Sequence, residues 1–94
     1  MTVDGRRQRR ALNAAEQALT ALEAGDAAGA RRAAREASDL DQVGAFAGFG
    51  TAVARAAADL DVLGLVADAS WEQVAGSLES GPLRSRAEAR RRGV

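Results

Sequence analysis

The spacing of apolar and polar positions predicts a helical chain organised around residues 42–61. This stretch holds both phenylalanines, and its thirteen positions from Gln42 to Ala54 are all uncharged. At helical period it shows two apolar stripes. The first comprises Val43, Phe46, Ala47, Gly50, Val53 and Ala57, and the second comprises Phe49, Ala52, Ala56, Leu60 and Leu63. A helix that is apolar on two sides needs neighbours on both, so we expect this segment to be the central helix.

Two helices are predicted before this segment, and they should form an antiparallel hairpin. The first starts at a cap on Asp4 and runs to about residue 24. Gly25 and Asp26 suit a short turn, because glycine favours the position after a helix and aspartate the position before one. The second helix runs over about residues 27–40. The inward positions of the two helices are Leu12, Ala15, Leu19 and Leu22 in the first, and Ala30, Ala33, Ala34 and Ala37 in the second.

Three glycines, Gly44, Gly48 and Gly50, lie within the predicted central helix. Each costs roughly 1 kcal/mol relative to alanine inside a helix. Either composition explains them, or a neighbouring helix crosses closely there, and we favour the close crossing. Asp41 is the expected N-cap. A similar pattern recurs twenty residues later around Asp61, which leaves open whether residues 42–69 form one helix or two.

Two further helices are predicted near the C-terminus. Ser70 and Gln73 match a capping box, and the helix they begin carries an apolar face and ends near residue 80. Gly81 and Pro82 mark a stop and a restart, followed by a helix over about residues 83–91 that is polar on all sides. We therefore predict a single helical domain over residues 1–80 and an Arg-rich C-terminal helix or tail over 81–94. The expected fold is all-α, a small bundle of four to six helices built from antiparallel hairpins.

Composition supports an all-α fold and limits the available chemistry. Of 94 residues, 24 are alanine, the best helix former, and all thirteen basic residues are arginine. Such a core is thin, so self-association or a partner would supplement it. The start of the chain shows no secretory signal, and the longest uncharged run is too short to span a bilayer, which needs about 20 apolar residues. We expect no membrane interaction and a cytoplasmic location.

The usual catalytic residue types are missing. The chain has no His, Cys, Lys or Tyr, so we expect no enzyme and no cofactor. Two Asp-Leu-Asp triplets, at residues 39–41 and 59–61, could form a divalent-cation site or could serve as helix caps and ion-pair partners. We favour the second interpretation, because helical residues two apart do not face one another. A carboxylate-based or metal-dependent hydrolase is the least favoured hypothesis.

Three aromatic residues and the two arginine-rich ends are candidates for binding a partner. Trp71 could anchor a partner, and the phenylalanines could line a pocket, although apolar residues on a helix face are more often core. The arginines could meet phosphates or an acidic partner, or could simply be solvated, and no aromatic residues interleave with them to stack on bases. The candidate partner-binding residues are Phe46, Phe49, Trp71, Arg6, Arg7, Arg90 and Arg91.

Residues 11–42 resemble one tetratricopeptide-type unit of about 34 residues. The matching positions are Gly25-Asp26 at the turn between helices, Ala30 and Ala37 in the second helix, and Leu40-Asp41 at its end. Gln42 stands where that family usually has proline. The resemblance implies stacked helical hairpins and a groove that binds a peptide or protein.

Taken together, these features predict a non-enzymatic helical module that binds another protein or itself. The alternative is a small nucleic-acid-associated protein that uses its arginine-rich termini.

Overall fold

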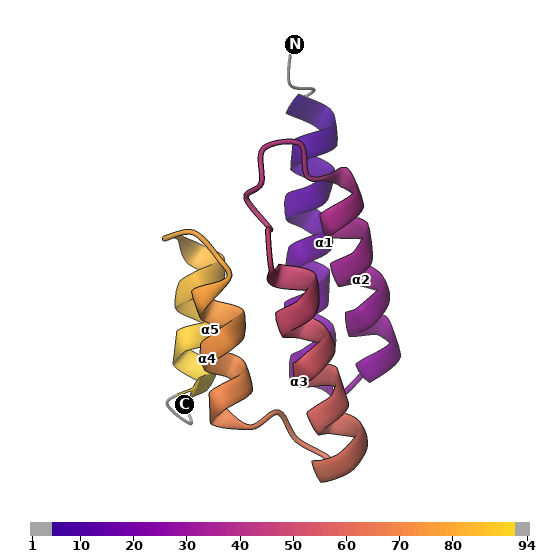
Figure 1. Ribbon diagram of the computed structural model, residues 1–94, viewed down its shortest axis with the longest axis vertical. Helices are drawn as coiled ribbons and strands as arrows, with labels where there is room; N and C mark the ends of the chain where they lie inside the picture. Colours follow the sequence, from indigo (N-terminus) through magenta and orange to yellow (C-terminus); the bar gives the residue numbers. More distant parts are fainter. Residues whose placement is uncertain (1–4, 92–94) are drawn as a thin grey trace.

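Five helices alternate in direction along the longest axis of the described chain (Figure 1). The computed structural model describes residues 5–91, with the last of these given by its backbone alone. The helices are α1 (Gly5–Ala24), α2 (Ala27–Leu40), α3 (Phe49–Leu63), α4 (Asp68–Gly76) and α5 (Pro82–Arg91). This confirms the all-α fold and the predicted number of helices.

Helices α1 and α2 form the predicted antiparallel hairpin. Gly25 adopts a left-handed φ of 79°, and the Asp26 carboxylate accepts a hydrogen bond from the Gly29 amide at 2.9 Å. The facing alanines of both helices are buried, and these small side chains let the two backbones approach closely. The predicted cap at Asp4 lies outside the described residues.

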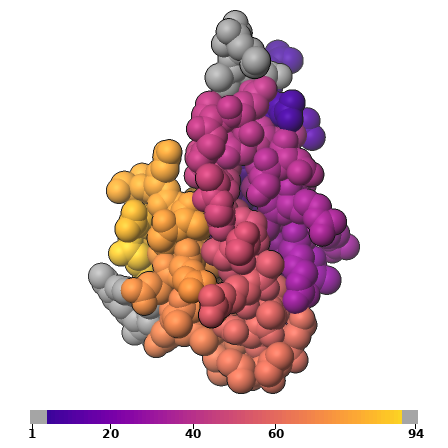
Figure 2. Space-filling view, in the orientation of Figure 1, coloured from indigo at the N-terminus to yellow at the C-terminus, as the bar shows by residue number. Residues whose placement is uncertain are grey.

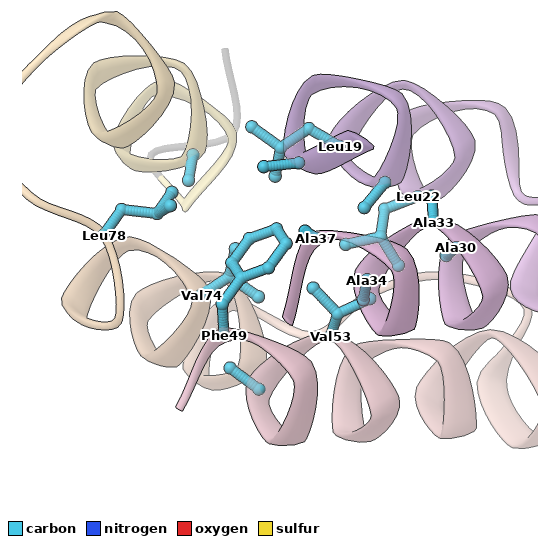
Figure 3. Close-up of a cluster of buried hydrophobic side chains, with 14 of the residues drawn as sticks. Leu19, Leu22, Ala30, Ala33, Ala34, Ala37, Phe49, Val53, Val74 and Leu78 are labelled. Atoms are coloured by element: carbon cyan, nitrogen blue, oxygen red, sulfur yellow. The ribbon is translucent and has the colours of Figure 1, made fainter. Parts of the chain in front are cut away.

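Helix α3 is the central helix, as predicted, with α2 and α1 on one side and α4 on the other (Figures 1 and 3). Phe49 and Val53 of α3 are fully buried. They meet Leu19 from α1 and Val74 from α4 in a single core, which the alanines of α2 complete. The two-sided apolar pattern is therefore satisfied by packing on both sides.

The central helix begins seven residues later than predicted, because residues 42–48 form a loop. Gly44 and Gly48 have left-handed φ values of 77° and 81°, and Gly48 directly precedes α3. These glycines serve turns, so the expected close crossing at these two positions is wrong. Gly50 does lie inside α3, and a Cβ there would stand 3.1 Å from the Ser38 hydroxyl of α2. Of the three glycines, only Gly50 lies close to a neighbouring helix.

Helix α3 is followed by a loop and then by the α4–α5 hairpin. Gly64 ends α3 with a φ of 76°, so residues 42–69 contain one complete helix, with α4 beginning only at Asp68. Asp61 does not cap a helix but pairs with Arg31 of α2 at 2.7 Å. The Asp59 carboxylate accepts from the Ala67 amide at 3.2 Å and from the Ser70 hydroxyl, so a side chain of α3 holds the start of α4.

Helices α4 and α5 pack on each other and complete the core. Trp71 and Val74 of α4 are buried, as the apolar face of the predicted helix requires. The helix ends at Gly76 rather than near residue 80, and Leu78 is buried in the turn that follows it. Helix α4 begins at Asp68, two residues before the predicted cap Ser70, which is itself buried. Pro82 opens α5 as predicted. That helix is not polar on all sides, because its Ala87 is fully buried.

Candidate functional site

An apolar groove of about 450 Å³ separates the first half of α1 from the α4–α5 turn, with the 41–48 loop along its third side. Figure 2 shows a notch between the upper part of the α4–α5 hairpin and this loop. The apolar residues that line the groove are Leu12, Val43, Ala45, Phe46, Leu78, Pro82 and Leu83. Arg9 and Glu79 are the charged residues of the lining.

The walls of the groove expose aliphatic side chains, and its lining reaches into the core. Leu12 is 42% exposed and Val43 is 57% exposed, whereas Phe46 is only 6% exposed. The Phe46 ring meets the Phe49 ring with centroids 5.8 Å apart and planes tilted by 57°, an arrangement that aromatic pairs favour. The groove is therefore backed by the packed core.

A single carboxylate organises the loop wall of the groove. Asp41 accepts hydrogen bonds from the backbone amides of Phe46 at 2.9 Å and of Val43 and Ala45 at 3.2 Å each. It also accepts from the Gln8 side-chain amide at 2.9 Å. The other end of Gln8, its carbonyl oxygen, accepts from the Gln42 amide at 2.8 Å. Both ends of the Gln8 side chain are thus used to tie α1 to the loop.

These contacts also set the ionisation of Asp41. Partial burial opposes the charged form, but the hydrogen bonds from Gln8 and from the backbone amides of Phe46, Val43 and Ala45 outweigh burial. The pKa of Asp41 is consequently lowered below its ordinary value. Because the bonds favour the charged carboxylate, the loop is most firmly held when Asp41 is ionised.

The two arginine-rich ends lie far apart. Arg7, at the start of α1, donates to the main-chain oxygen of Asp39 at 2.8 Å, and Arg90, near the end of α5, donates to Glu23 at 3.0 Å. Glu23 is sixteen positions after Arg7 on α1, which is about 24 Å along the helix axis. Arg6 lies beside Arg7 in the first turn of α1. The candidate arginines therefore do not gather in one patch, and the side chain of Arg91 lies outside the described residues.

Glu23 fastens α5 to α1. It binds Arg86 through both carboxylate oxygens and Arg90 through one of them. The hydrogen bond from Arg86 is the main reason that the pKa of Glu23 is lowered, and Arg90 adds to the effect against the opposing influence of burial. Its side chain is 16% exposed, so these bonds form in a partly desolvated setting.

The three aromatic candidates are all buried, and Phe46 is the one that lines the groove. Phe49 and Trp71 lie in the core cluster. Sequence reasoning placed Leu12 and Val43 on helix stripes and did not identify them as wall residues. The spacing of Gly44 and Gly48 was the available signal, because glycines this dense indicate a loop.

The carboxylates of the Asp-Leu-Asp triplets are held by protein groups. Asp41 organises the loop, Asp59 holds α4 and Asp61 pairs with Arg31. Within residues 5–90, no group of three or more His, Cys, Asp or Glu side chains is arranged to hold a metal ion. Nor does any helix of the described chain combine the length and apolarity needed to cross a membrane.

Comparison of the chain with protein-family models, with curated proteins and with solved structures finds no significant match. The tetratricopeptide-like interpretation of residues 11–42 therefore stays a prediction.

Proposed function

We propose that the chain is a helical protein-interaction module that acts by binding rather than by catalysis. An apolar segment of a partner protein docks in the groove between α1, the 41–48 loop and the α4–α5 turn. The observation that carries the proposal is the exposure of Leu12 and Val43 on two walls of a concave site. Isolated exposed aliphatic residues are common on protein surfaces, whereas aliphatic walls around a groove are typical of binding sites. The cytoplasmic location expected from the sequence is part of this proposal.

The polar groups of the groove favour a protein segment over a small polar ligand. Small-molecule sites bring a few polar groups to converge on the ligand. Here Gln8 is occupied at both ends by Asp41 and Gln42, and Arg9 and Glu79 lie on different elements. What the groove offers an occupant is mainly aliphatic surface with charges beside it, which suits an apolar segment flanked by charged residues.

Photo-crosslinking from inside and outside the groove tests the proposal. Benzoylphenylalanine at position 43 samples the groove, and the same group at position 51 samples an exposed site on α3. In cells that express the chain, we expect discrete protein adducts from position 43 that position 51 does not give. Adding Leu12→Gln to the position-43 chain should abolish them. Leu12 is half-exposed, so this substitution costs only about 1 kcal/mol of folding stability.

Two results would contradict the proposal. One is the same set of adducts from both positions. The other is a set of position-43 adducts that Leu12→Gln leaves unchanged in a chain that is still folded by circular dichroism.

A further inference from the structure

A second apolar surface lies at the opposite end of the molecule from the groove. We name it the α3–α4 corner and define it by Val62, Leu63 and Leu65, which are 81%, 58% and 59% exposed. In Figure 1 the corner is at the bottom, where α3 turns toward α4, and the 41–48 loop is at the top. From these exposed fractions, the three side chains present on the order of 300 Å² of apolar surface, a size at which patches on monomers tend to be functional.

We infer that the α3–α4 corner of one copy docks in the groove of a second copy, so that the chain assembles head to tail. The inference rests on the proposed function, since it names the occupant of the same groove. The corner presents exposed aliphatic side chains, and the groove is concave and aliphatic. The described helices span 43 Å along the longest axis, and the two surfaces lie toward its opposite ends, so a chain cannot fill its own groove.

The charges around the two surfaces are complementary. Four arginines, Arg6, Arg7, Arg9 and Arg10, lie in the first two turns of α1, and Arg9 lines the groove. The corner is bracketed in sequence by Asp61, which already pairs with Arg31 of α2, and by Asp68, which is exposed. Asp68 is therefore the acid that the corner offers to a second copy. Residues 56–83 contain five acidic residues and no basic one. One of those acids, Glu79, lies on the far wall of the groove, so the attraction is directed to the α1 side. An acid-flanked apolar segment is the occupant that this groove would attract.

This geometry has a consequence for the form of the assembly. A contact between two different surfaces is heterologous, so each copy keeps one unused groove or corner at the end of the assembly. Growth then continues until a ring closes, or it continues as a chain. The corner is small compared with the roughly 800 Å² per partner of a stable interface, so we expect dissociation constants of tens to hundreds of micromolar.

A complementation experiment tests the inference. The groove variant is Leu12→Gln, and the corner variant combines Val62→Gln with Leu65→Gln, all at exposed positions. Sedimentation velocity should show wild-type mass rising with concentration past that of a dimer, and each variant alone should be monomeric. An equimolar mixture of the two should form a 1:1 dimer and stop there, because one intact groove and one intact corner remain. Thr51→Gln, exposed and outside both surfaces, should behave as wild type.

The salt dependence of association supplies a second measurement. Arg9→Glu should weaken wild-type association several-fold at low salt, and the difference should shrink as salt screens the charges.

Three outcomes would overturn the inference, and they separate it from the proposed function. A wild-type chain that is monomeric up to millimolar concentration excludes self-assembly. Loss of association in the groove variant but not in the corner variant shows that another segment fills the groove. Failure of the mixture to form the dimer shows that the groove of one copy does not bind the corner of another. In each case the crosslinking experiment from position 43 still decides whether the groove binds protein.

Discussion

Replacing Asp41 with alanine should destabilise the protein far more than an ordinary surface substitution does. The Asp41 carboxylate accepts four hydrogen bonds, from Gln8 and from the amides of Val43, Ala45 and Phe46. A hydrogen bond contributes about 1 kcal/mol net, more when the acceptor is charged. Counting the two bonds of 2.9 Å fully and the two of 3.2 Å at about half, we expect a loss of about 2–3 kcal/mol. For a domain of this size, that lowers Tm by roughly 10–20 °C.

Urea and thermal unfolding at neutral pH, followed by circular dichroism, measure this loss. Asp39→Ala is the matched control. Asp39 is an exposed aspartate two positions earlier, and its main-chain oxygen, which alanine retains, is the atom that accepts from Arg7. A carboxylate in the last turn of α2 also opposes the helix dipole, so the control should lie within about 0.5 kcal/mol of wild type. Amide exchange at Phe46 should accelerate in Asp41→Ala alone.

The effect should also depend on pH in a defined direction. Because the pKa of Asp41 is lowered in the folded protein, its stabilisation is present at neutral pH and is lost as the pH falls through the folded-state pKa. The difference between wild type and Asp41→Ala should therefore narrow on acidification. The pKa of Glu23 is also lowered, but Glu23 is present in both proteins. Its contribution to the pH dependence therefore cancels in the difference between their stabilities. Equal stabilities of the Asp41 and Asp39 variants, or a difference that is constant with pH, would refute this account of the loop.

Three further substitutions test other contacts by urea or thermal unfolding. Glu23→Gln should lower the free energy of unfolding by about 1–2 kcal/mol, because Arg86 and Arg90 both pair with the Glu23 carboxylate. Arg84→Gln, which removes an exposed pair with Glu88, should lower it by less than about 0.5 kcal/mol. Similar losses in the two variants would show that Glu23 does not anchor α5. Gly48→Ala should cost about 1–2 kcal/mol because its φ of 81° disfavours a Cβ, whereas Gly76→Ala, in open space at the end of α4, should stabilise by about 0.5. If Gly48→Ala cost no more than Gly76→Ala, the left-handed conformation at residue 48 would be contradicted. Ser70→Ala should cost about 1 kcal/mol through its lost bond to Asp59, and exposed Ser85→Ala almost nothing; equal values would mean that Asp59 does not hold α4.

The α1–α2 hairpin and the apolar face of α4 could be predicted because the interactions that define them are local. The positive φ at Gly25 and the cap from Asp26 to Gly29 act within a few residues. The buried alanines follow the helical period, and they form the face on which the other helix packs. The two-sided pattern around Phe49 and Val53 likewise identified α3 as central before its neighbours were known.

The 41–48 loop could not be predicted from the pattern alone. Residues 42–48 satisfy a helical period, so they extended the predicted helix. In the structure, the Asp41 carboxylate takes the amides of Ala45 and Phe46, which a helix would have used internally. Gln8, 33 positions away, holds that carboxylate in place. Gly44 and Gly48 supply the left-handed turns that this path requires. A contact between distant segments decided which of two locally acceptable conformations forms.

The sequence by itself therefore determined the helical class, the hairpin and the central position of α3, because propensity, capping and periodicity act over one or two turns. Tertiary structure decided the rest. Glu23 anchors α5 through Arg86, 63 residues away, and so gives a mainly polar helix a place in the bundle. The groove exists only where the start of α1, the loop and the α4–α5 turn meet. Its walls come from three separate segments, so the pattern of any one of them carries no sign of the cavity between them.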